Sequence, residues 1–155
     1  MNIQKPLKRQ ITIEIISFFF ILLFVYAAVT KLMDLEKFRI QIGQSPLLTE
    51  IAGTVAWLVP TSEIFVALLL STSRFRLHGL MLSVILMVMF ATYIFVIVNF
   101  SEHVPCSCGG VLQQLNWRDH LIFNIVFVIL GILGTFLQYN NPDKKTSTIK
   151  NILLQ

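Results

Sequence analysis

The chain has 155 residues, of which 55% are hydrophobic and only 13% are charged. Soluble proteins carry about 25% charged residues, so this composition excludes an ordinary water-soluble domain, and the 13 phenylalanines exclude a disordered chain. The net charge of +4 is compatible with nucleic-acid binding, but the basic residues lie at the ends of apolar runs and form no continuous stripe. The composition therefore indicates a membrane protein and no nucleic-acid partner.

Four apolar runs are long enough to cross the hydrocarbon core of a bilayer, which takes about 17–25 helical residues. They cover approximately residues 11–30, 51–70, 77–98 and 121–137. Helices are expected because every backbone polar group in lipid must find a partner within its own segment. The sequence thus predicts an all-α membrane protein, an antiparallel bundle of four transmembrane helices spanning residues 1–139, followed by a cytoplasmic tail at 140–155.

The distribution of lysine and arginine predicts the orientation of this bundle. Eight basic residues fall on one side of it: Lys5, Lys8, Arg9, Arg74, Arg76, Lys144, Lys145 and Lys150. The opposite side carries Lys31, Lys37, Arg39 and Arg118, which are offset by acidic residues. Because cytoplasmic loops are enriched in basic residues, we expect a multi-pass protein of the inner (cytoplasmic) membrane with both termini in the cytoplasm. The connection between the third and fourth runs would then be extracytoplasmic.

Two of the connections have distinct features. Residues 71–76 form a connection so short that the second and third helices must be antiparallel neighbours. Residues 32–50 are longer and place Leu35, Phe38 and Ile42 at helical spacing among charged residues. We therefore expect a short amphipathic helix on the outer face, ended by Ser45-Pro46.

The only cysteines, Cys106 and Cys108, lie on the predicted outer connection, where free thiols tend to be oxidised. A disulfide between cysteines two residues apart closes a small, strained ring, and strain makes a disulfide easier to reduce. Pro105 before the pair and Gly109 after it favour the tight bend that such a ring requires. The pattern is typical of a reactive pair that performs thiol exchange.

Other interpretations of the pair remain open. The cysteines can be inert thiols that stabilise a loop, in a membrane subunit or scaffold without enzymatic activity. Alternatively, His103, Cys106, Cys108 and His120 combine imidazole and thiolate groups that suit zinc or copper. Their spacing does not match a standard zinc finger.

Polar residues inside the apolar runs are the other candidates. Glu63 lies within the second run, where an ionised carboxylate is costly and needs a partner. Lys31, at the outer end of the first run, is the expected partner, since its long stem can lie along apolar surface. Asn124, one turn into the fourth run, is expected to bond either the cysteine loop or Glu63. Arg118 would favour a nearby thiolate, or pair with Asp119 or lipid headgroups.

Several of these motifs together resemble the MauE branch of the MauE/DoxX family of membrane proteins. The likeness rests on four spans, on Cys106-Ser107-Cys108-Gly109, on Trp117-Arg118-Asp119 leading into Asn124, on Ala27-Ala28-Val29-Thr30-Lys31-Leu32 and on Pro60-x-x-Glu63. The resemblance implies a role in thiol redox chemistry or disulfide maturation of extracytoplasmic proteins. MauE itself is associated with maturation of the disulfide-rich small subunit of methylamine dehydrogenase. The outline is also similar, more distantly, to the four-helix bundles of DsbB and VKOR.

The number of cysteines limits the mechanism. A protein that passes electrons between two dithiols needs a second cysteine pair, which this chain lacks. Cys106 and Cys108 must therefore exchange electrons with a separate molecule in each half-reaction. We expect one to be an extracytoplasmic thioredoxin-like or disulfide-containing protein. The other is a second protein or a membrane quinone, and the sequence assigns no other cofactor.

Overall fold

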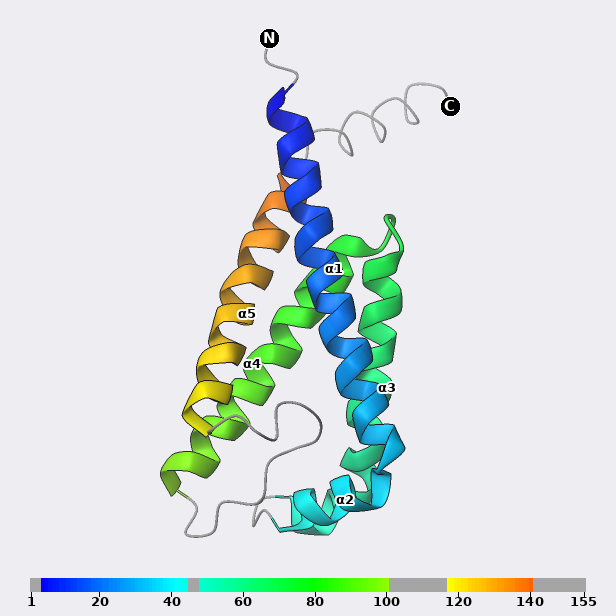
Figure 1. Cartoon of the computed structure of the whole chain (residues 1–155), viewed down its shortest axis with the longest axis vertical. Helices are drawn as coiled ribbons and strands as arrows, with labels where there is room; N and C mark the ends of the chain where they lie inside the picture. Colours follow the sequence, from blue (N-terminus) through cyan, green and yellow to red (C-terminus); the bar gives the residue numbers. More distant parts are fainter. Residues whose placement is uncertain (1–3, 45–47, 101–116, 141–155) are drawn as a thin grey trace.

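The computed structural model describes residues 4–44, 48–100 and 117–140. Four long helices form an up-and-down bundle, and a short helix crosses one of its ends (Figure 1). The elements in chain order are α1 (Gln4–Met33), α2 (Leu35–Gly43), the 3-10 turn η1 (Thr49–Ile51), α3 (Ala52–Ser71), α4 (Arg76–Phe100) and α5 (Trp117–Tyr139). Around the bundle the order is α1, α3, α4 and α5, with α5 returning to α1. The predicted all-α class and four-helix architecture are confirmed.

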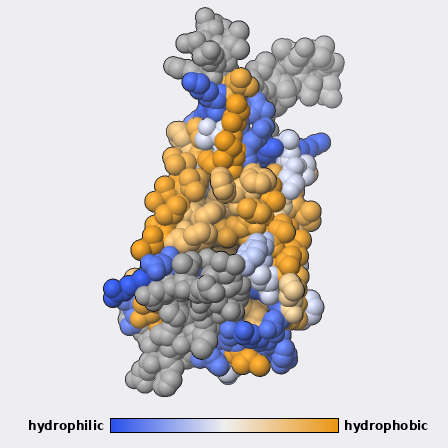
Figure 2. Space-filling model, in the orientation of Figure 1, coloured by the Kyte–Doolittle hydropathy of each residue, from blue (hydrophilic) through white to orange (hydrophobic). Residues whose placement is uncertain are grey.

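Each of the four long helices is long and apolar enough to cross a membrane. Hydrophobic residues cover the middle of the molecule in Figure 2, and hydrophilic residues gather toward its two ends. Many large apolar side chains on this band are exposed, among them Phe18, Phe65, Leu68 and Phe136. In water such a surface would be unstable, whereas lipid tails solvate it. The chain is thus a multi-pass membrane protein.

The first helix is longer than the apolar run that predicted it. It begins at Gln4 rather than near residue 11, because Lys8 and Arg9 are good helix formers that continue the helix beyond the hydrocarbon region. Its 30 residues extend for about 45 Å, enough to cross the headgroup layers as well. The other boundaries agree with the predicted runs within a few residues.

The predicted amphipathic helix is present as α2. Asp34 caps its first turn by accepting a hydrogen bond from the backbone N–H of Lys37 at 3.4 Å. Phe38 and Ile42 are buried in a small cluster with alanines at the start of α3. The helix therefore lies across the end of the bundle where α1 finishes and α3 begins (Figure 1).

The main core lies between the four long helices. Phe20 and Phe24 of α1 are fully buried, and Phe20 meets Phe127 of α5 edge-to-face with ring centroids 5.3 Å apart. Close packing at the end of the bundle away from α2 depends on glycine. A Cβ added to Gly79 would lie 2.9 Å from the backbone nitrogen of Leu70, and one added to Gly131 would lie 2.7 Å from the Val84 side chain. These contacts fix the spacing of α4 against α3 and of α5 against α4.

Replacing Gly79 with alanine tests this spacing. The added methyl group meets backbone that cannot move without separating α3 from α4, so we expect a loss of about 1–3 kcal/mol in the free energy of unfolding. Gly53→Ala is the matched control, because its nearest atom would be the flexible Arg39 side chain at 3.6 Å. Unfolding of both variants in detergent is the measurement. Equal stability of the two variants would contradict the close-contact argument.

Candidate functional site

An ion pair between α1 and α3 is the most buried charged contact described. Lys31 Nζ lies 2.7 Å from Glu63 Oε1, and the two side chains are 12% and 1% exposed. Nζ also donates to the Ala27 carbonyl at 3.3 Å and lies 5.7 Å and 5.8 Å from the ring centroids of Phe38 and Phe90. The contact predicted from the sequence is confirmed, and two aromatic rings complete the surroundings of the ammonium.

The local sequence explains how the two groups meet. α1 and α3 are antiparallel neighbours, and Lys31 near the end of α1 reaches Glu63, which lies just past the middle of α3. Pro60, buried one turn before Glu63, has no N–H and leaves the carbonyl of Ala56 without its usual helical partner. The carbonyl without a helical partner makes the backbone one to two turns before Glu63 more polar than the backbone of an unbroken transmembrane helix.

Only one of the two carboxylate oxygens of Glu63 has a hydrogen-bond partner among the described residues. Oε1 accepts from Lys31, whereas Oε2 is buried and has no hydrogen-bond partner among the described residues. Buried polar atoms nearly always have a partner, and an exception often marks a functional position or a water site. Glu63 thus combines a structural ion pair with an unused acceptor.

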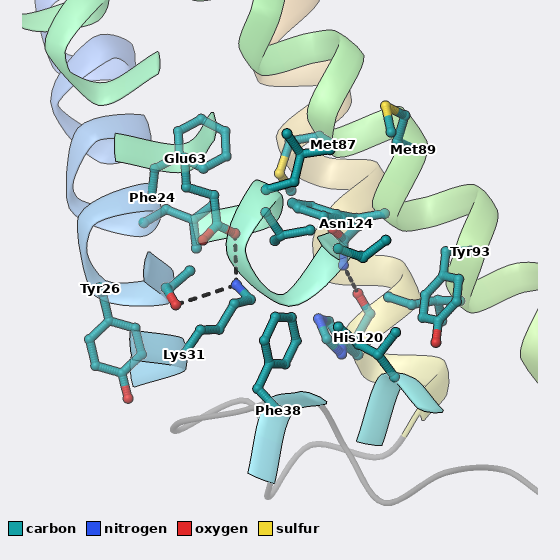
Figure 3. A pocket seen from close by; sticks show the side chains of 18 of the residues that line it. Phe24, Tyr26, Lys31, Phe38, Glu63, Met87, Met89, Tyr93, His120 and Asn124 are labelled. Carbon is teal, nitrogen blue, oxygen red and sulfur yellow. Dashed lines mark hydrogen bonds and ion pairs between the residues drawn. The ribbon is translucent and has the colours of Figure 1, made fainter. Parts of the chain in front are cut away.

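Beside this pair is a cavity of about 350 Å³ at the α2 end of the bundle (Figure 3). Side chains from α1, α2, α3, α4 and α5 line it, and most are aromatic or aliphatic. Its charged and strongly polar lining groups are Lys31, Glu63, His120 and Asn124. An apolar cavity with a few polar groups on its walls is the usual form of a small-molecule site.

Asn124 and His120 reach the cavity from one face of α5. Asn124 Nδ2 donates to the His120 carbonyl at 2.8 Å, one turn earlier in the same helix. The sequence predicted a bond from Asn124 to the cysteine loop or to Glu63. The bond described is a local one, which an asparagine in a helix can make to its own preceding carbonyl, and the cysteine loop lies outside the described residues. Arg118, two residues before His120 in the same helix, is exposed.

Five of the predicted site residues lie outside the described residues. They include the predicted redox pair and most of the alternative metal ligands: His103, Pro105, Cys106, Cys108 and Gly109. Their place in the chain is between Phe100, which ends α4, and Trp117, which begins α5. Of the alternative metal ligands, only His120 is described, and it lines the cavity. The described ranges contain no group of three histidine, cysteine or acidic residues able to hold a metal.

The size and the lining of the cavity were not predicted from the sequence. Lys31 and Glu63 were recognised because charges stand out in apolar runs, whereas His120 was considered only as a metal ligand. The spacing of His120 and Asn124, four residues apart, places them on one helical face and could have indicated a shared polar wall. Aromatic lining residues such as Phe90 carry no such signal, because they look like any core or lipid-facing residue.

Comparison with known families adds a direct assignment. The family model described as methylamine utilisation protein MauE matches residues 9–137. The chain belongs to the MauE family. The match includes all of the cavity-lining residues as well as Cys106 and Cys108. No curated protein and no solved structure gives a significant match.

Breaking the Lys31–Glu63 pair should destabilise the bundle. Glu63→Ala leaves the ammonium of Lys31 unpaired in an apolar environment, and we expect a loss of about 3 kcal/mol or more. Glu63→Gln should cost less because it retains shape and hydrogen bonding. Lys31→Met combined with Glu63→Ala should be no worse than either single change, which a double-mutant cycle of unfolding in detergent measures.

The matched control is the pair of Glu14 and Arg76, whose charged atoms are 3.8 Å apart and in which the Glu14 side chain is 51% exposed. Glu14→Gln should change the stability by less than about 1 kcal/mol, because the carboxylate of Glu14 remains solvated. If Glu63→Ala and Lys31→Met were as mild as Glu14→Gln, the buried pair would contribute nothing to the fold.

Proposed function

We propose that this MauE-family protein supports thiol–disulfide exchange, or disulfide maturation, of extracytoplasmic proteins through Cys106 and Cys108. The observation that supports this proposal is the position of the two helix ends that flank the cysteine segment. In the chain the segment follows α4 and precedes α5, and α4 ends and α5 begins at the end of the bundle that holds α2 and the polar cavity (Figure 1). The basic α3–α4 turn lies at the opposite end. Under the positive-inside rule, the α2 end is then extracytoplasmic and oxidising.

The proposed chemistry is attack of a thiolate on a disulfide sulfur, with a mixed disulfide as the intermediate. In one half-reaction the Cys106–Cys108 pair exchanges two electrons with a thioredoxin-like or disulfide-containing partner. In the other, a second protein or a membrane quinone restores the starting state of the pair. The family description supports an accessory role in methylamine utilisation, in which the partner would be a disulfide-containing protein of that system.

The orientation on which this proposal depends can be measured by cysteine labelling. After mild reduction, a membrane-impermeant maleimide added to intact cells or spheroplasts should modify Cys106 and Cys108. A single cysteine placed at Ser73, in a variant without the native pair, should be labelled only after the membrane is opened, since Ser73 lies in the α3–α4 turn. The reverse labelling pattern would place the cysteine pair in the cytoplasm.

Single cysteine substitutions test the exchange itself. We expect Cys106→Ser or Cys108→Ser to trap a mixed disulfide with a partner, visible as a band lost on reduction in non-reducing electrophoresis. Both variants should reduce partner oxidation or reduction to background. Ser107→Ala is the matched control and should behave as the parent. A double serine variant that still supports maturation would indicate a scaffold, and one Zn or Cu per chain lost with His103 or His120 would indicate a metal site.

A further inference from the structure

We propose that the cavity beside Lys31 and Glu63 binds an uncharged, lipid-soluble molecule through an aromatic ring that carries a hydroxyl group, such as a phenol or hydroquinone. The ring would occupy the apolar part of the cavity, and its hydroxyl would donate a hydrogen bond to Glu63 Oε2. This is a proposal about binding alone. It does not depend on the cysteine chemistry proposed above.

The unused carboxylate oxygen determines which hydrogen-bonding group fits. Glu63 is 1% exposed, and its Oε1 is already held by Lys31 at 2.7 Å. A carboxylate oxygen accepts hydrogen bonds and donates none, so the atom that satisfies Oε2 must carry a hydrogen. A bare ketone, an ether or a hydrocarbon chain would leave Oε2 unpaired, whereas a hydroxyl group satisfies it.

The charge balance of the cavity favours a neutral ligand. The ammonium of Lys31 and the carboxylate of Glu63 neutralise each other at contact distance. A charged ligand would add an uncompensated charge to a space lined mainly by apolar groups, which is strongly unfavourable. The ligand must also reach the cavity from the surrounding lipid, which again favours an uncharged molecule.

The shape and lining of the cavity favour an aromatic ring. Phe24, Phe38, Phe90 and Phe123 contribute ring surfaces to its walls, and Met87 adds a polarisable thioether (Figure 3). A volume of about 350 Å³ is near the lower end of small-molecule pockets, which suits one ring with short substituents. His120 reaches the cavity from α5, across from Glu63 of α3, so a hydroquinone could present a second oxygen to it.

Binding can be measured on the full-length protein in nanodiscs under argon, with four probes that share a ten-carbon chain. They are 2-decyl-1,4-hydroquinone, its dimethyl ether, 4-decylphenol and 1-decanol. We expect saturable stabilisation against heat by the hydroquinone and the phenol, and at least tenfold weaker apparent affinity for the ether and the alcohol. A hydroquinone preferred over the phenol would show that both oxygens are recognised, and equal affinity would show that one hydroxyl suffices.

A cavity-filling substitution locates the site. Val59→Phe places a ring in the cavity from α3 and leaves Lys31 and Glu63 intact, so hydroquinone affinity should fall at least tenfold. Leu68→Phe is the matched control, because Leu68 belongs to the same helix and its side chain is 63% exposed. This variant should bind hydroquinone as the parent does. Because the probe series uses the parent protein, it remains decisive if Val59→Phe does not fold. Equal binding of all four probes, or no saturable binding, would overturn the proposal.

Discussion

The cost of a charge in a membrane is the constraint on which the α2 end of this bundle depends. Glu63 has almost no contact with solvent, so its carboxylate requires a cation, and Lys31 supplies one from the neighbouring helix at 2.7 Å. The pair fixes the relative height of α1 and α3, because sliding either helix by one turn would separate the charges by about 5 Å. Helix packing in lipid gains little from the hydrophobic effect, since lipid tails are as apolar as leucine. A single polar contact therefore specifies the register more sharply than the surrounding apolar contacts do.

The rest of the α2 end is arranged around that pair. α2 contributes Phe38, whose ring approaches the ammonium of Lys31, and α4 contributes Phe90 at a similar distance. These rings shield the cation from solvent without adding another charge. The pairing leaves Oε2 of Glu63 unused, and the cavity lies beside it. The same interaction thus stabilises the fold and leaves one buried polar atom without a hydrogen-bond partner among the described residues.

The fold could be predicted from the sequence because the features that determine it extend over many residues. Four apolar runs require four helices, the short connection before Arg76 requires antiparallel neighbours, and Leu35, Phe38 and Ile42 specify an amphipathic helix. The Lys31–Glu63 pair could be predicted because two isolated charges in neighbouring apolar runs have few alternative partners. The size and lining of the cavity could not, since they depend on how Phe90, Met87 and Phe123 from different helices pack. The local bond of Asn124 to the His120 carbonyl could not be predicted either, because several partners compete for an asparagine side chain in a helix.

The location of the cavity follows from the unequal distribution of side-chain sizes along the bundle. Away from α2, Gly79 and Gly131 allow the helices to approach so closely that an added methyl group would clash, and at Gly134 it would make a tight contact. Toward α2, the facing positions hold phenylalanines, two methionines, a histidine and the ion pair. Large rings on several helices cannot all interdigitate around a buried ion pair that must keep its own geometry. The helices are therefore held together at one end by small residues and kept apart at the other by large ones, and α2 covers the end that remains open (Figure 1). A cavity in this position opens where a molecule dissolved in the outer part of the bilayer would arrive, if the α2 end is the extracytoplasmic one.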